Sequence, residues 1–282
     1  NDSLIGVRDP FGIRPLVLGK LNDTYILSSE SCGLDIIGAD LIRDVEPGEI
    51  LIIKNHKIES IKPFKKTYLR PCLFEYIYFS RPDSILEGRN VYDVRKSIGH
   101  QLAVENPNDN KIIDVVIPIP DSGNASALGY SEKIKKPFEF GIIRNHYTGR
   151  TFIEDSISVR NLSVKLKHNP NIFSFKDKSI ALVDDSIVRG TTSVKIVEML
   201  RNCGVKNVHM RIASPPVKHP CFYGIDTPTK EELLASKFTI DQIKKYIGAD
   251  SLKFVTLDGV YKALGFQNGR EKEKPMFTDH YF

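Results

Sequence analysis

One stretch, residues 179–193, constrains the fold of this chain more than any other. It reads Ser-Ile-Ala-Leu-Val-Asp-Asp-Ser-Ile-Val-Arg-Gly-Thr-Thr-Ser. The apolar run from Ile180 to Val183 predicts a strand that is buried on both faces, as parallel strands are. Two adjacent carboxylates, Asp184 and Asp185, follow it, and a loop of small residues then leads into a helical pattern. This strand–loop–helix unit indicates an open α/β sheet, which binds ligands at the carboxyl ends of its strands.

The loop after the two carboxylates has the composition of a phosphate site. A helix N-terminus offers backbone N–H groups and the positive end of the helix dipole, both of which suit an anion. Two carboxylates nearby would repel a phosphate by about 1 kcal/mol across solvent. If the ligand is a sugar phosphate, however, the carboxylates accept hydrogen bonds from neighbouring hydroxyls, each contributing about 1.5–3 kcal/mol. The pattern therefore predicts a sugar-phosphate site. An acidic turn before an ordinary capped helix is the alternative, and it leaves the Arg-Gly-Thr-Thr string unexplained.

The rest of the second half alternates between strands and helices. Residues 112–117 predict another buried strand, which runs into the small loop Asp121-Ser122-Gly123 and a helix over 125–133. Apolar residues at helical spacing over 194–203 end at Gly204, and 208–212 alternate as a strand does. The alternation predicts a doubly wound parallel sheet. If its strands are parallel neighbours, the loops at 121–123 and 184–193 face one crevice.

The first 62 residues have a different pattern. Residues 4–7, 16–18, 25–27 and 49–53 are strand-like, and Asn22-Asp23 and Pro47-Gly48 supply turns. This segment predicts antiparallel β structure. Alone it would leave open sheet edges, so we expect it to be the end of a larger β-rich domain. A basic stretch between Pro63 and Pro71 reads as a linker.

Composition narrows the classes of function. A length of 282 residues with 41% hydrophobic content suits two domains. The net charge of +5 comes from 40 basic and 35 acidic residues with no dense basic block, so we expect no nucleic-acid partner. No apolar run is long enough to span a membrane. The four cysteines lie far apart, which fits reduced thiols and predicts a cytoplasmic protein.

The motif at 183–192 resembles the phosphoribosyl pyrophosphate (PRPP) loop of type I phosphoribosyltransferases. Its form Ser-Ile-Val-Arg-Gly-Thr-Thr is similar to that of the glutamine PRPP amidotransferase family. The resemblance continues through 5–18, 72–84 and 219–228, and so covers nearly the whole chain. It implies an α/β fold: a type I phosphoribosyltransferase parallel sheet flanked by helices over 67–282. The antiparallel β-rich end of an N-terminal-nucleophile glutaminase domain would precede it over 1–66.

The resemblance also implies a set of site residues. The catalytic set is Asp184, Asp185, Arg144, Tyr147 and Arg150, and magnesium would be held by Ser122, Asp184 and Asp185. The long polar stretch 144–167 looks like the flexible loop that closes over the substrate in this family, although His146 stands where a residue such as Arg is expected. PRPP would be bound by Asp121, Ser122, Gly123, Asp184, Asp185, Ser186, Arg189, Gly190, Thr191, Thr192 and Ser193.

The implied reaction joins PRPP to ammonia made from glutamine, giving 5-phosphoribosylamine and pyrophosphate. This is the first step of de novo purine (IMP) biosynthesis, and the family further implies feedback inhibition by purine nucleotides and a homo-oligomer. Glutaminases of this class attack with an N-terminal Cys. This chain starts at Asn1, and Cys32 has no base arranged nearby in sequence, so we expect it to use supplied ammonia at most.

Two other functions share the loop. A phosphoribosyltransferase that uses a free base would have it, but would not explain the N-terminal β segment. A non-catalytic PRPP-binding regulator could also keep it, and we would then expect a DNA-binding module, which the sequence does not indicate.

Some members of the family carry an iron–sulfur cluster. Cys72 and Cys221 match two of its four cysteine positions, but the segment Phe277–Phe282 has no Cys-x-x-Cys. Since such clusters take four thiolates, we expect none here.

Overall fold

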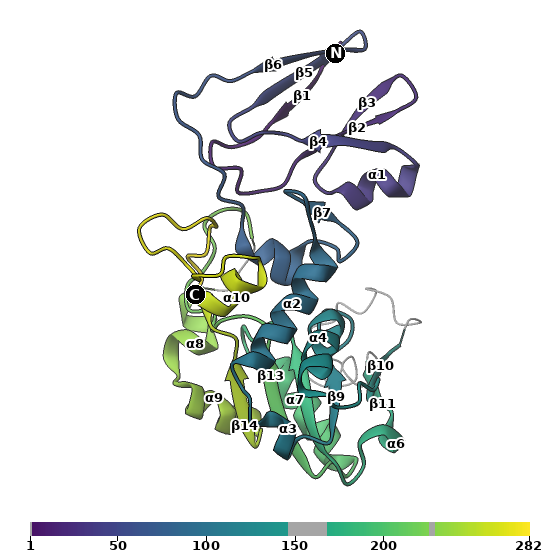
Figure 1. The fold of residues 1–282 in the computed structure, drawn as a ribbon, viewed down its shortest axis with the longest axis vertical. Helices are drawn as coiled ribbons and strands as arrows, with labels where there is room; N and C mark the ends of the chain where they lie inside the picture. The colour runs from purple at the N-terminus through teal and green to yellow at the C-terminus, as the bar shows by residue number, and fades with distance from the viewer. Residues whose placement is uncertain (1, 146–167, 226–228) are drawn as a thin grey trace. The chain divides into compact units, whose positions relative to one another are not determined.

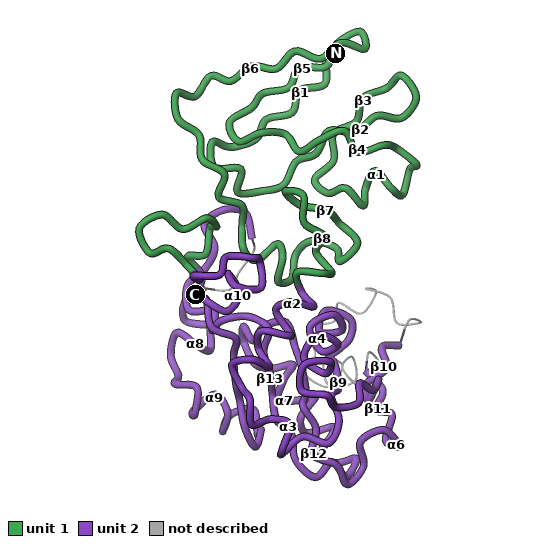
Figure 2. Tube along the Cα trace, in the orientation of Figure 1, with its two compact units in different colours: residues 1–94, 270–280 green, residues 95–269, 281–282 purple. Residues whose placement is uncertain are grey.

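The computed structural model describes residues 2–145, 168–225 and 229–282. Residues 146–167 of the predicted flexible loop, which include His146, Tyr147 and Arg150, therefore lie outside the described residues. The chain divides into two compact units (Figure 2). The first consists of Asn1–Val94 and Arg270–His280, and the second of Arg95–Gly269 and Tyr281–Phe282. The two compact units divide between residues 94 and 95. This division reflects how tightly the chain packs and does not test the domain boundary predicted at 66/67, which stays a prediction.

The first unit begins with two three-stranded antiparallel sheets (Figure 1). One sheet has the order β1-β5-β6 and the other β3-β2-β4, with α1 (Ser31–Ile37) beside β3 and β4. The antiparallel β structure predicted for this segment is thus confirmed. Its apolar contacts centre on buried side chains such as Leu18, Val45 and Leu51. The strands are β1 (Leu4–Val7), β2 (Val17–Leu21), β3 (Thr24–Ser28), β4 (Asp40–Asp44), β5 (Ile50–Lys54) and β6 (Lys57–Ile61).

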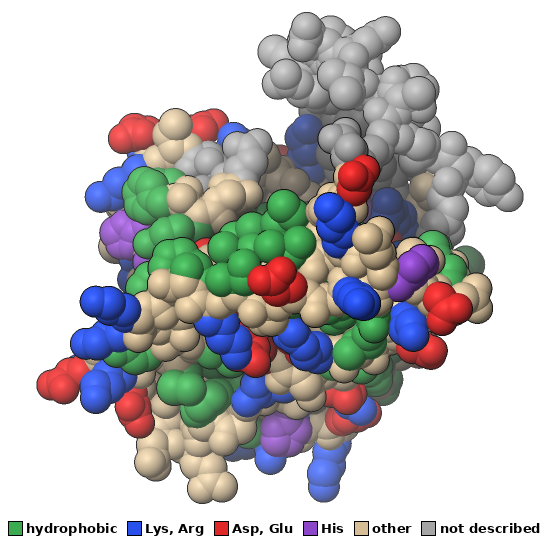
Figure 3. Space-filling model, turned by 90° about the horizontal axis from the view of Figure 1, so that it is seen from above, with side chains coloured by type: hydrophobic (Ala, Val, Ile, Leu, Met, Phe, Trp, Pro, Cys, Tyr) green, Lys and Arg blue, Asp and Glu red, His purple; other side chains and the backbone are tan. Residues whose placement is uncertain are grey.

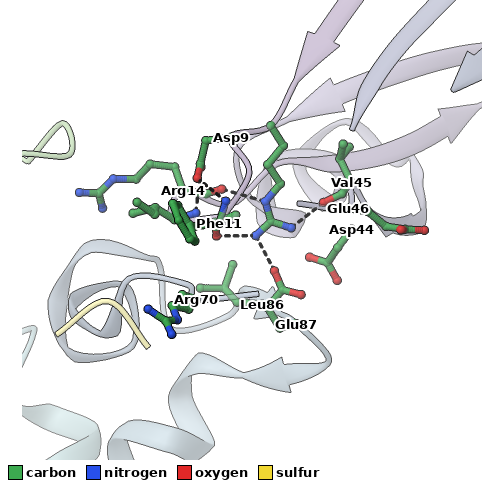
Figure 4. A network of polar contacts seen from close by, with 12 residues as sticks. Asp9, Phe11, Arg14, Asp44, Val45, Glu46, Arg70, Leu86 and Glu87 are labelled. Carbon is green, nitrogen blue, oxygen red and sulfur yellow. Dashed lines mark hydrogen bonds and ion pairs between the residues drawn. The ribbon is translucent and has the colours of Figure 1, made fainter. Parts of the chain in front are cut away.

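A buried arginine, Arg8, joins the β segment to the rest of the first unit, and its partners Arg14, Val45 and Glu87 are labelled in Figure 4. That rest contains a π-helix at Glu75–Phe79, the hairpin of β7 (Ile85–Leu86) and β8 (Arg89–Asn90), and the start of α2 (Val91–Val104). Arg8, only 2% exposed, donates to the carbonyl oxygens of Arg14 (3.1 Å) and Val45 (2.5 Å) and to the Glu87 carboxylate (2.5 Å). Because four hydrogen bonds, including one to the Gly12 carbonyl, surround it, the guanidinium is satisfied although buried.

The second unit is built on a parallel four-stranded sheet with the order β14-β13-β12-β9. The predicted parallel sheet is confirmed. Strand β12 is buried along its whole length, as its unbroken apolar run predicted. The strands are β9 (Val115–Pro118), β12 (Ser179–Asp184), β13 (Asn207–Ile212) and β14 (Ser251–Phe254).

Helices cover both faces of this sheet (Figure 1). Alternate residues of β12, Ile180 and Leu182, share a core with Ile196 of α7 (Thr191–Asn202) and Ile243 of α9 (Ile240–Ile247). Helix α4 (Asn124–Ile134) packs on β9 and β12 and lies in front of the sheet in the view of Figure 1, where α7 lies behind it. The remaining elements are α3 (Asp109–Ile112), β10 (Ile142–Arg144), β11 (His168–Pro170), α6 (Ile172–Phe175), η2 (Lys230–Glu232), α8 (Leu234–Lys237) and α10 (Leu257–Ala263).

One predicted strand starts later than its apolar pattern suggested. Ile112 belongs to the short helix α3 and is 47% exposed, so β9 begins only at Val115. Helix α3 begins at Asp109, and Arg211 of β13 donates to both carboxylate oxygens of that residue, at 2.6 and 2.7 Å. Tyr130 also donates to Asp109. Burial would raise the pKa of Asp109, but the hydrogen bonds and charge of Arg211 lower it below its ordinary value. This buried cluster fixes α3, whose last residue, Ile112, the sequence had placed in the strand.

The described surface fits the mixed charge of the sequence. On the face shown in Figure 3, Lys and Arg side chains are interspersed with Asp and Glu among the described residues. In the described part of the chain, every helix is too short or too polar to cross a bilayer.

Candidate active site

Two neighbouring acids stand at the carboxyl end of the central strand β12. Asp184 is the last residue of the strand and Asp185 follows it; their side chains are 8% and 6% exposed. The backbone N–H of Asp185 donates to Asp184 Oδ1 at 2.9 Å. The Ser186 hydroxyl donates to Asp185 Oδ1 at 2.6 Å, and the Ser122 hydroxyl also hydrogen-bonds to Asp185. The acid pair is therefore held from the loops on both sides.

Burial makes the charged form of these acids costly. It raises the pKa of Asp184 well above the ordinary value, and the negative charge of Asp185 raises it further. Burial also raises the pKa of Asp185, although the hydroxyls of Ser122 and Ser186 and the charge of Arg95 oppose the shift. Arg95, which is 3% exposed, was not among the residues that the sequence analysis selected. A ligand that donates hydrogen bonds, or a cation, would relieve the unfavourable burial of this pair.

The loop Asp121-Ser122-Gly123 lies directly beside the acid pair. β9 and β12 are parallel neighbours, and the Ile119 N–H donates to the Val183 carbonyl at 2.8 Å just beyond the ladder. A Cβ on Gly123 would lie 2.6 Å from the same carbonyl oxygen, so a glycine is required at this approach. The two loops meet at one edge of the sheet because their strands are parallel neighbours, the condition under which the sequence analysis expected them to do so.

Arg144 adds a basic side chain to this edge. It is the last residue of β10 and pairs with the Asp121 carboxylate, and both side chains are about half exposed. The structure thus brings Arg144, Asp121, Ser122 and the acid pair together through successive contacts. Tyr147 and Arg150 lie outside the described residues.

The residues after the acid pair form the turn into α7, and residues 186–193 are called the phosphate loop below. Gly190 precedes the helix with φ of 74°, the left-handed region that favours glycine. The helix starts at Thr191, and its first N–H groups have no partner within the helix, as at every helix start. Thr191 and Thr192 are exposed, Ser193 is 3% exposed, and Arg189 pairs with Glu232. The turn can seat an anion on backbone N–H groups and threonine hydroxyls.

The cysteines matched to the iron–sulfur pattern lie in different units. Cys72 is buried in the first unit, and Cys221, in the second, accepts a hydrogen bond from the Tyr223 N–H at 3.2 Å. The expectation that no cluster forms stays a prediction.

Comparison with known proteins assigns a class to this arrangement. A family model described as the phosphoribosyl transferase domain matches residues 83–214, which contain the acid pair, both loops, Arg95 and Arg144. The parallel sheet and the two loops at its carboxyl edge thus lie in a region that is similar to the phosphoribosyl transferase domain. The amidophosphoribosyltransferase of Rhizobium etli is 53% identical over 285 residues, which cover 99% of this chain and 57% of that protein.

Two solved structures agree with this relationship. The glutamine PRPP amidotransferase of Bacillus subtilis complexed with ADP and GMP matches with a TM-score of 0.86 and 45% identity, covering 94% of this chain and 57% of that one. A structure described as the allosteric regulatory enzyme of purine biosynthesis matches with a TM-score of 0.88 and 44% identity, covering 98% and 58%. The chain belongs to the amidophosphoribosyltransferase family, and it spans little more than half the length of these relatives.

Proposed function

We propose that this chain carries the phosphoribosyl-transfer site of an amidophosphoribosyltransferase. The reaction would join ammonia to C1 of the ribose of PRPP and release pyrophosphate, giving 5-phosphoribosylamine for purine biosynthesis. The observation that carries this proposal is the buried acid pair, which stands between two loops at one edge of the sheet. The names of its relatives support the same reaction.

Each part of the site would hold one part of PRPP. Asp184 and Asp185 would accept hydrogen bonds from the ribose hydroxyls, which relieves the cost of burying two charges. The phosphate loop would seat the 5-phosphate on backbone N–H groups and on the hydroxyls of Ser186, Thr191 and Thr192. The loop of Asp121, Ser122 and Gly123 would receive the pyrophosphate, because it lies beside the acid pair and offers backbone donors and the Ser122 hydroxyl. The buried Ser193 would support the turn from inside.

The oxygen donors at this edge fit a magnesium ion. Ser122, Asp184 and Asp185 are joined by contact, and a hard cation prefers such oxygens. Among the described residues no group of three or more His, Cys, Asp or Glu is placed to hold a metal ion by itself, so the protein would supply few of the ligands. Mg²⁺ suits that situation because it usually keeps several waters and binds substrate phosphates. When bound, it would neutralise negative charge on the pyrophosphate oxygens.

The chain's own residues would stabilise the charges that develop during transfer. As the bond from C1 to pyrophosphate lengthens, positive charge grows on the ribose, and the acid pair would stabilise it. Arg144 would leave Asp121 to meet the departing pyrophosphate, and Tyr147 and Arg150 are proposed to assist it. The nucleophile must be neutral ammonia, since ammonium has no lone pair. A site that excludes water would be a further advantage.

The whole-enzyme properties are proposed from relatives. Glutamine would supply the ammonia, and purine nucleotides would inhibit, as the ADP and GMP bound to the Bacillus subtilis enzyme suggest. We further propose a homo-oligomer in the cytoplasm, with no nucleic-acid or membrane partner.

Pyrophosphate release tests the proposal. The chain is incubated with PRPP and Mg²⁺ at alkaline pH, with ammonium, with hypoxanthine, or with neither. We expect pyrophosphate release only in the incubation that contains ammonium. Release only with hypoxanthine would favour a free-base phosphoribosyltransferase, and PRPP binding without release would favour a regulator.

A further inference from the structure

A segment later in the chain packs against residues 187–190 of the phosphate loop. This segment, residues 229–237, contains η2 and α8 and is called the brace here. The Leu234 N–H donates to the Val188 carbonyl oxygen at 2.9 Å. The Leu234 side chain is 7% exposed and shares a hydrophobic core with Ile187. The brace therefore contacts both the backbone and the side chains of the loop.

The brace also packs against the turn that starts α7. A Cβ on Gly190 would lie 2.7 Å from Leu234 Cδ2 and 3.4 Å from a ring carbon of Tyr246. Gly190 is the residue before the first turn of α7, whose N–H groups would face a bound phosphate. A shift of the brace would thus move the phosphate-binding turn.

An ion pair completes the contact. Arg189 Nε and Nη2 lie 3.2 and 3.1 Å from Glu232 Oε1. The other carboxylate oxygen of Glu232 accepts from the Thr229 N–H at 3.1 Å, in a capping box at the start of η2. Glu232 is therefore fixed within the brace while it holds Arg189 of the loop.

We propose that the brace positions the phosphate loop and that Glu232, acting through Arg189, is a positioning residue for binding of a sugar 5-phosphate. A loop held in its binding conformation before the ligand arrives loses less conformational freedom on binding. Arg189 serves in this role as the link to the brace, and the phosphate is left to the backbone and hydroxyl groups. The identity of the ligand, PRPP, rests on the proposed function.

The test compares Glu232→Gln with Glu231→Gln in the full chain. Both variants remove one negative charge from the same turn of η2, but Glu231 is exposed and interacts with Thr229 of the brace itself. Hydrogen exchange of the amides at 187–191 measures loop order without any ligand, and calorimetry measures the Kd for PRPP with Mg²⁺. Because Arg189 and Glu232 are 56% and 46% exposed, we expect changes of about two- to fivefold.

With Glu232→Gln, we expect faster exchange of the loop amides and weaker PRPP binding. With Glu231→Gln, we expect neither change. Arg189→Gln should match Glu232→Gln, and the double variant should add little to either single variant. The differences should shrink at 1 M salt, where exposed charges are screened.

Each contrary outcome has a defined meaning. The brace proposal is wrong if Glu232→Gln leaves the hydrogen exchange of the loop amides unchanged, or if Glu231→Gln speeds it equally. This holds whatever the Kd for PRPP is. A looser loop with an unchanged Kd overturns its role in binding. If Glu232→Gln speeds exchange in the loop but the wild-type chain does not bind PRPP, the brace does position the loop. In that case the proposed function is wrong instead.

Discussion

Gly123 and Val183 meet so closely that no side chain fits between them: a Cβ on Gly123 would lie 2.6 Å from the Val183 carbonyl oxygen. The same Cβ would lie 2.8 Å from the Ile119 carbonyl oxygen. Both neighbours are backbone atoms, which cannot rotate away. This approach sets the spacing between the loop after β9 and the acid pair after β12.

Gly123→Ala should therefore push the two loops apart. We expect a loss of stability of about 1–3 kcal/mol, the usual cost of overpacking, and at least tenfold weaker PRPP binding. Urea unfolding and calorimetry measure the two effects. Gly38→Ala is the control, because its Cβ would meet no atom within 4 Å although its φ of 71° is strained for alanine. That variant should lose about 1 kcal/mol and keep its PRPP affinity. An unaltered Kd in Gly123→Ala would contradict the proposed spacing.

Asp184→Asn and Asp185→Asn should each weaken PRPP binding. A hydrogen bond to a charged group contributes about 1.5–3 kcal/mol, so we expect a loss of roughly 10- to 150-fold in Kd for each. Calorimetric titration in the presence of Mg²⁺ measures it. Asp241→Asn, at an 86% exposed position on α9, removes a charge elsewhere and should bind as the wild type does. Unchanged binding in both site variants would remove the role assigned to the acid pair.

The buried Glu49 gives the first unit an acid-sensitive contact. Arg43 hydrogen-bonds to both carboxylate oxygens at 2.7 Å and, against the opposing effect of burial, lowers the pKa of Glu49 to about 2 from 4.5, with help from Ser60 and the Glu46 N–H. A lowered pKa stabilises the fold above the unfolded value, and this stabilisation is lost as the pH falls through the folded value.

Glu49→Gln should accordingly lose about 3 kcal/mol of stability at neutral pH, and the difference from wild type should close between about pH 4.5 and pH 2. Urea unfolding across this range checks the prediction, with the exposed Glu59→Gln as a control that should show little change. A difference that stays constant down to pH 2 would rule out this titration as the cause.

Arg211 and Asp109 form a buried pair whose loss should be costly. Their side chains are 1% and 8% exposed, and Arg211→Met would leave the Asp109 charge buried without its main partner. We expect a loss of about 3–5 kcal/mol, partly recovered by adding Asp109→Asn. The pair of Arg201 and Asp250 is the matched control, since both side chains are 34% exposed and Arg201→Met should cost about 1 kcal/mol or less. Equal losses in the two single variants, measured by urea unfolding, would contradict the account.

The local pattern of the sequence was enough to predict the two loops that follow neighbouring strands. The apolar run over Ile180–Val183 and the small loop at Asp121–Gly123 each carry a signal within a few residues, and parallel pairing then places them together. The local pattern of the sequence predicted only a sugar phosphate as the ligand. The proposal that this ligand is PRPP came from the resemblance of the phosphate loop to a known family.

Contacts between distant residues could not be found in this way. Arg211 meets Asp109 across 102 positions and Arg189 meets Glu232 across 43, and neither partner carries a local signal of the other. The same limit explains the error at Ile112, which is apolar but exposed on a helix held by such a distant pair. Arg95 was missed for this reason as well, since only the fold brings its charge near Asp185.

The most direct test of the central claim is a crystal structure of the chain with PRPP and Mg²⁺. We predict the ribose hydroxyls on Asp184 and Asp185, the 5-phosphate in the turn of 186–193 and the pyrophosphate at 121–123. Density for the sugar at any other place, or none at saturating PRPP, would contradict the assignment of this site.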